Sequence, residues 1–100
     1  MAARKKTLSM IEDAYERTSR FVRVFGTYWA KHALEQIDRA QGSYEVGDLR
    51  KAVSEITSAM VSLQKSVARE ATATVAKEAM AIARDLNKIV FALTGELSRD

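Results

Sequence analysis

The feature that most limits the fold of this chain is its shortage of residues that break helices. The sequence contains no proline, and its four glycines stand at positions 26, 42, 47 and 95. Glycine and proline are the residues that most often interrupt regular structure. The only cluster of breakers is GSYEVG, at residues 42–47. The sequence therefore predicts two long periodic segments joined by a loop over residues 42–47.

The first segment is predicted as an amphipathic helix over residues 7–41. Apolar and small side chains recur there at steps of three and four, which places them on one face of a helix. Val22, Phe25 and Trp29 lie near the middle of this face. Gly26 costs about 1 kcal/mol relative to alanine inside a helix, which a helix of this length tolerates.

The second segment is predicted as a helix over residues 48–94, with Asp48 as its N-cap and Gly95 as its C-cap. Its heptad series contains an additional step of four near residues 68–75, which indicates either a stutter or a break in the helix. Together with the face of the first segment, this series predicts a bundle or dimer seam. The seam consists of Val22, Phe25, Trp29, Leu49, Val53, Ile56, Met60, Leu63, Val67, Val75, Ile82, Leu86, Ile89 and Leu93.

The lengths of the two segments predict an assembly. At 1.5 Å per residue they span about 50 Å and about 70 Å. A hairpin of two such helices leaves wide apolar faces exposed, and faces of that kind mark a partner site. We therefore expect an all-α fold, a long antiparallel helical hairpin that forms a homodimer resembling a four-helix bundle or coiled coil. The alternative is a monomeric three-helix bundle, with the second segment broken near residues 68–75.

One hundred residues are predicted to form a single helical domain. Residues 1–6 are expected to be a basic arm before the first helix, and residues 95–100 a tail after the second. The basic start is followed by Glu12 and Asp13 instead of the apolar run of a signal peptide. No apolar run approaches the length that spans a membrane. We therefore expect a cytoplasmic protein.

Residue types with catalytic or metal-binding chemistry are scarce. Cysteine is absent, and His32 is the only histidine, so thiol chemistry and a thiolate metal site are excluded. His32 and Glu35 stand in the reverse of the Glu-x-x-His order of di-iron bundles. The sequence also lacks a phosphate-binding glycine loop and a nucleophile elbow. We expect no enzymatic activity, no metal and no cofactor.

The stretch RFVRVFGTYW, residues 20–29, is the most informative part of the chain. It holds four of the seven aromatic residues together with two arginines. On the predicted helix, one set of its side chains joins the seam and the other set lies amid positive charge. The second set, extended by its neighbours, is a candidate partner patch: Lys6, Arg17, Arg20, Phe21, Val24, Tyr28 and Lys31.

Three interpretations of this patch remain open. It can be a second packing face, with arginine stems covering the rings, a protein-binding site, or a surface on which nucleic-acid bases stack. A membrane partner is not expected. The sequence favours a non-enzymatic association or adaptor protein, a homodimer that binds or scaffolds another protein. The alternative is a small nucleic-acid-binding accessory or regulatory protein.

Overall fold

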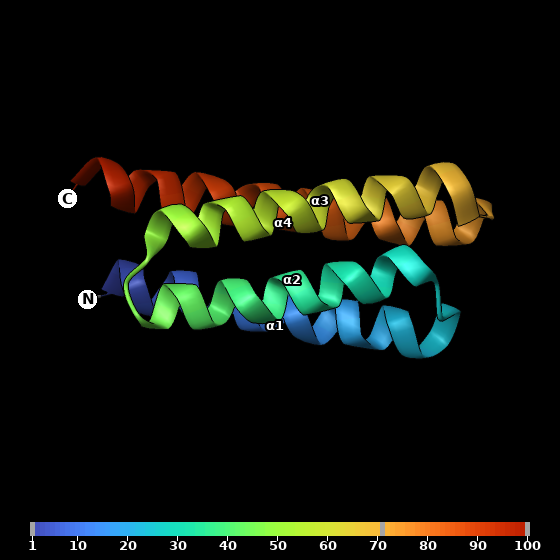
Figure 1. Ribbon diagram of the computed structural model, residues 1–100, viewed down its shortest axis with the longest axis horizontal. Helices are drawn as coiled ribbons and strands as arrows, with labels where there is room; N and C mark the ends of the chain where they lie inside the picture. Colours follow the sequence, from blue (N-terminus) through green and yellow to red (C-terminus); the bar gives the residue numbers. More distant parts are fainter. Residues whose placement is uncertain (1, 71, 100) are drawn as a thin grey trace.

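The computed structural model describes residues 2–70 and 72–99, and these residues form a bundle of four helices. It contains α1 (Ala2–Phe25), α2 (Tyr28–Glu45), α3 (Leu49–Glu70) and α4 (Ala73–Arg99). Successive helices run in opposite directions, and each packs against the two that flank it around the bundle (Figure 1). The bundle is 42 Å long and 19 by 17 Å across. The expectation of an all-α bundle is confirmed.

The described helices outnumber the two expected over residues 7–41 and 48–94. One reason is that the first segment is divided at Gly26. This glycine adopts a φ of +63°, a conformation that costs other residues about 1–2 kcal/mol. Its N–H donates to the carbonyl oxygen of Val22 at 2.8 Å, the bond that closes a helix in the left-handed cap motif. The glycine thus ends α1, where the sequence predicted a tolerated interior position.

The second segment is divided as well. Helix α3 ends at Glu70 and α4 begins at Ala73, so the chain is broken inside the span 68–75 where a stutter or break was expected. Thr72 precedes α4, and its hydroxyl accepts a long bond of 3.4 Å from the N–H of Val75. The alternative three-helix bundle contains this break but not the one at Gly26.

The turn between α2 and α3 is shorter than the predicted loop over residues 42–47, because α2 continues to Glu45. Gly47 has a φ of +83°. Its N–H donates to Tyr44 O, while the N–H of Asp48 donates to Ser43 O, which together form a Schellman motif. The side chain of Asp48 then accepts a bond of 3.2 Å from the N–H of Lys51. Asp48 is therefore the N-cap that the sequence predicts.

The predicted arm and tail are helical where they are described. Helix α1 begins at Ala2, so it includes most of the span 1–6. Helix α4 continues to Arg99 through Gly95, which therefore does not cap it. The start of α1 and the end of α4 lie beside the α2–α3 turn, and the α1–α2 turn lies at the opposite end of the bundle (Figure 1). We call that opposite end, which holds Gly26 and Thr27, the α1–α2 end.

The core follows a heptad pattern in each helix separately. Interior positions recur at steps of three and four, the spacing that keeps one face of a helix towards its neighbours. Many of these residues are small, which permits close packing between helices. The buried residues of the helices are Thr7, Ile11, Ala14, Thr18 and Phe21 in α1, Ala30, Ala33, Ile37, Ala40, Ser43 and Tyr44 in α2, Ala52, Ile56, Ala59, Ser62, Leu63 and Ser66 in α3, and Val75, Ala79, Ile82, Ala83, Leu86, Ile89 and Leu93 in α4.

The inward face of α1 is rotated from the predicted one. Phe21 is 3% exposed and belongs to the core, whereas Phe25 is 37% exposed. Trp29 is half-buried and belongs to α2, which runs in the opposite direction. The predicted face combined residues on both sides of Gly26 into one helix. A common helical phase does not exist across the turn, and the face was therefore misplaced.

Other members of the predicted seam belong to the core of this single chain or pack against it. Ile56, Leu63, Val75, Ile82, Leu86, Ile89 and Leu93 are buried, while Val22, Leu49, Val53, Met60 and Val67 are partly buried against them.

Candidate docking groove between α1 and α4

Two neighbouring cavities lie along the contact between α1 and α4. One has a volume of about 400 Å³ and is lined by Met10, Asp13, Ala14, Glu16, Arg17, Arg20, Asp85, Lys88 and Ile89. The other has a volume of about 620 Å³ and is lined by Arg17, Arg20, Phe21, Val24, Phe25, Thr74, Lys77, Glu78, Ala81 and Arg84. Because both are lined by Arg17 and Arg20, we treat them as one groove. The first is its middle part, and the second is its outer part, which reaches the α1–α2 end.

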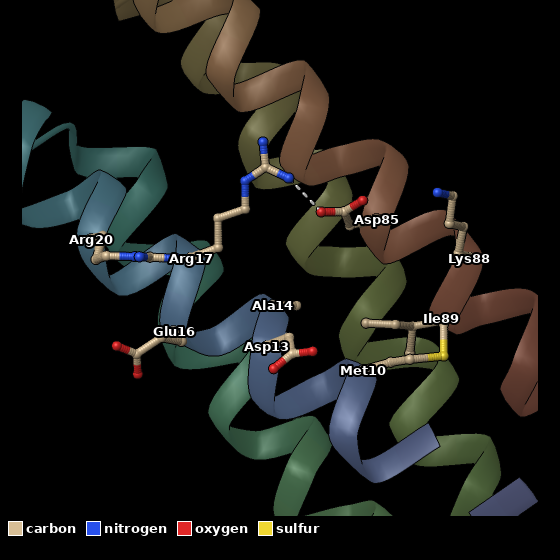
Figure 2. A pocket seen from close by; sticks show the side chains of 9 residues that line it. All are labelled: Met10, Asp13, Ala14, Glu16, Arg17, Arg20, Asp85, Lys88 and Ile89. Atoms are coloured by element: carbon tan, nitrogen blue, oxygen red, sulfur yellow. Dashed lines mark hydrogen bonds and ion pairs between the residues drawn. The ribbon is translucent and has the colours of Figure 1, made fainter. Parts of the chain in front are cut away.

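Arg17 crosses the groove from α1 to α4. Its Nε lies 3.0 Å from Glu78 Oε1, and its Nη1 lies 2.6 Å from Asp85 Oδ2. Figure 2 shows this side chain reaching towards Asp85, with Met10 and Ile89 close together farther along the cavity. The hydrogen bond to Glu78 is the largest cause that raises the pKa of Arg17; burial opposes the shift, and Asp85 adds to it. The positive charge of Arg17 is therefore neutralised within the bundle.

The outer part of the groove contains apolar side chains at different depths. Phe21 is buried at its base, and its ring centroid lies 5.0 Å from that of Phe25. Val24 is 73% exposed and Phe25 is 37% exposed. Large apolar side chains gathered at a cavity are typical of interaction surfaces, whereas scattered ones are ordinary. This part of the groove thus has an apolar floor that reaches solvent.

Basic residues surround that floor. Arg20 on α1 and Lys77 and Arg84 on α4 line the outer part of the groove, and all three are exposed. In the part of the chain that the structure describes, the ion pairs of this groove are made by Arg17, so these three charges stay without an acidic partner. The outer part of the groove is consequently positive on both walls.

The excess of basic residues extends over the whole α1–α2 end. Division of each helix at its middle assigns residues 14–36 and 60–86 to this half of the bundle. These ranges contain eight of the 16 basic residues and five of the 13 acidic ones. The total charge of +3 therefore divides into +3 for this half and 0 for the rest.

A second aromatic cluster lies on α2, away from the groove. The rings of Tyr28 and His32 are 4.7 Å apart, and those of Trp29 and His32 are 5.4 Å apart. Lys65 of α3 places its Nζ 4.5 Å from the centre of the Trp29 ring, a cation–π contact. These residues belong to the α2–α3 contact, where a cavity of about 270 Å³ lies beside Trp29, His32 and Lys65.

The predicted patch is therefore divided by the turn at Gly26. The groove brings together Arg17, Arg20, Phe21 and Val24, although Phe21 is buried and Arg17 is paired. Tyr28 and Lys31 stand on α2, and Lys6 is exposed on α1 towards the other end.

Sequence reasoning missed the contribution of α4. Lys77 and Arg84 are seven residues apart and so lie on one face of a helix. That spacing is visible in the sequence, but nothing in it shows that this face meets α1. Only the break between α3 and α4 turns the chain back, so that α4 packs along α1.

Other kinds of site have little support. Residues 2–70 and 72–99 contain no group of three histidine, cysteine, aspartate or glutamate side chains that could hold a metal ion. None of the described helices combines the length and apolar character needed to cross a membrane. Comparison with protein-family models, with curated proteins and with solved structures gives no match. The function must therefore be inferred from the groove itself.

Proposed function

We propose that the protein is a non-enzymatic association module that binds another protein in the groove between α1 and α4. The observation that carries this proposal is the outer part of the groove, where Val24 and Phe25 are exposed to solvent beside the buried ring of Phe21. Apolar centres with charged rims are typical of protein interfaces.

Nucleic-acid binding is the second candidate, and the +3 charge of the α1–α2 half favours it. A nucleic-acid backbone is bound by neutralising its phosphates with basic side chains. Four acidic side chains line the groove; Glu78 and Asp85 pair with Arg17, whereas Asp13 and Glu16 stand in the middle part. A phosphate backbone that followed the whole groove would be repelled by Asp13 and Glu16, whereas a protein can place other side chains there, so the groove fits a protein partner better.

The homodimer expected from the sequence stays a prediction, but its original reason has gone. It rested on two helices of about 50 and 70 Å that left wide apolar faces uncovered. Four shorter helices of one chain now cover these faces with one another. We therefore propose that a single chain is the binding unit. The cytoplasmic location likewise stays a prediction.

Photo-crosslinking tests the proposed site. A benzophenone amino acid replaces Val24 in the groove or Val46 at the opposite end of the bundle, which are 73% and 81% exposed. We expect position 24, but not position 46, to form a discrete protein adduct in cells. The adduct identifies a partner, which is then purified for binding measurements.

The matched variants Val24→Asp and Val46→Asp show whether the groove itself binds this partner. Val24→Asp should weaken binding of the purified partner at least about tenfold, equivalent to about 1.4 kcal/mol, while Val46→Asp leaves it unchanged. Equal effects of the two substitutions, or no adduct at position 24, would exclude the groove as the docking site.

A further inference from the structure

The shape of the groove limits what can occupy it. Its lining on α1 extends from Met10 to Phe25, which corresponds to about 22 Å, or about four helical turns. The walls are two neighbouring antiparallel helices, so the groove follows the bundle axis (Figure 1). A helix laid along such a pair can place its side chains between the ridges of both. The groove thus fits one helix of about 15 residues.

The apolar side chains of the groove follow this direction. Met10 is partly exposed in the middle part beside the buried Ile89, and Val24 and Phe25 are exposed in the outer part beside the buried Phe21. Arg17 stands between them, but its charge is held by Glu78 and Asp85, and arginine stems commonly cover apolar surface. An amphipathic helix with apolar residues at steps of three and four would match this row of side chains.

The charges along the groove are unequal. At the outer part, Arg20 on one wall faces Lys77 and Arg84 on the other. In the middle part, the α1 wall carries Asp13 and Glu16 as well as Arg20, and the α4 wall carries Lys88. Acidic residues on both sides of the apolar stripe of a bound helix would therefore face basic side chains on both walls only in the outer part.

We propose that the occupant is an amphipathic helix of a partner protein with acidic residues on both sides of its apolar stripe at one end, and that this end binds beside Arg20, Lys77 and Arg84. This inference rests on the proposed protein-binding function and adds the chemistry and direction of the partner. The acidic end of the helix lies nearest the turn at Gly26. Mixed charges along its remainder match the middle part of the groove.

Synthetic peptides test this chemistry directly. Three helical peptides of about 18 residues share one leucine and alanine stripe and differ at the flanking positions of one end, which carry glutamate, glutamine or lysine. Fluorescence anisotropy measures their binding at about 50 mM and about 300 mM salt, because exposed charge pairs are screened by salt. We expect the glutamate peptide to bind at least about tenfold more tightly than the glutamine peptide at low salt. The lysine peptide should bind most weakly.

Charge reversal in the protein should reverse this order. The triple variant Arg20→Glu, Lys77→Glu and Arg84→Glu should bind the lysine peptide more tightly than the glutamate peptide. All three side chains are exposed, and a circular dichroism melt checks that the variant folds.

The matched control changes three exposed basic residues elsewhere, Arg39→Glu, Arg50→Glu and Lys51→Glu. It alters the net charge by the same amount and should keep the original order of the peptides. The same reversal in both triple variants would overturn the proposal, because net charge alone would then explain the preference.

The remaining outcomes separate this inference from the proposed function. A partner crosslinked at position 24, together with equal binding of the three peptides, overturns the acidic helix and leaves the docking groove in place. No adduct at position 24 overturns the groove itself. A single-stranded oligonucleotide of about 20 nucleotides is the last probe. If it binds more tightly than every peptide, and if the groove triple variant loses this binding, the proposal is overturned in favour of nucleic acid.

Discussion

Phe21 and Phe25 are the same residue type one helical turn apart, yet they have different surroundings. Phe21 is 3% exposed in the core, and Phe25 is 37% exposed at the groove. We predict that Phe21→Ala lowers the free energy of unfolding by about 3–5 kcal/mol, because it removes a large buried side chain and leaves a cavity. Phe25→Ala should cost about 1 kcal/mol or less, as surface changes usually do.

Urea unfolding of the two variants measures this difference. A loss for Phe25→Ala that equals or exceeds that for Phe21→Ala would show that α1 presents its other face to the core. The sequence alone predicts this reverse order, since its helical phase is carried across Gly26 to Trp29. The comparison therefore tests the turn as well as the two rings.

At the scale of the helices, Gly26 is the residue on which the four-helix arrangement depends most. Its φ of +63° is unfavourable for alanine by about 1–2 kcal/mol. The nearest atom to an added Cβ is Val22 O at 3.8 Å, an ordinary contact, so the cost comes from the backbone and not from a clash. We predict that Gly26→Ala destabilises the protein by about 1–2 kcal/mol.

Gly42 provides the matched control, because it lies inside α2 with nothing within 4 Å of an added Cβ. Gly42→Ala should stabilise the protein by about 0.5–1 kcal/mol, since alanine loses less conformational entropy in a helix. Thermal melts of both variants give the comparison. A stabilising Gly26→Ala would mean that α1 and α2 join into one helix.

The helical content and the turn near Gly47 could be predicted from the sequence, because periodicity and capping residues are local signals. The break at Gly26 could not be, since one glycine among periodic neighbours is compatible with either a helix or a turn. The choice depends on tertiary packing. Breaking a helix gives up a few backbone hydrogen bonds, each worth about 1 kcal/mol net. Burying one large apolar side chain gains about 1.5–3 kcal/mol, so folding back to cover the apolar faces wins.

At the scale of the whole molecule, one chain closes its own core. We predict that the purified protein is a monomer at micromolar concentration, with a radius of gyration near the 13.1 Å of its Cα atoms. Small-angle scattering together with light scattering measures both size and mass. A mass of twice 11.1 kDa would restore the predicted homodimer, which would then have to use a surface other than the buried seam.

The candidate site could be predicted only in part. Arg20 and Val24 were identified because they share a stretch rich in aromatic and basic residues. Lys77, Ala81 and Arg84 were not, because they lie more than fifty positions away along the chain and reach the groove only through the packing of α4 on α1. Local patterns can suggest one wall of a groove, but the opposite wall depends on the tertiary fold.

The uneven charge of the two halves gives the molecule an electric dipole along its long axis. The centres of the two halves are separated by a substantial part of the 42 Å length, which is longer than the Debye length of about 8–10 Å in physiological salt. A charged partner at close range therefore experiences one half more strongly than the other. The acidic end of a partner helix is attracted towards the α1–α2 end, which orients this helix along the groove before contact and raises the rate of productive encounters. The fold thus also orients the partner during diffusion. Added salt should weaken this long-range orienting effect before it weakens the contacts in the groove.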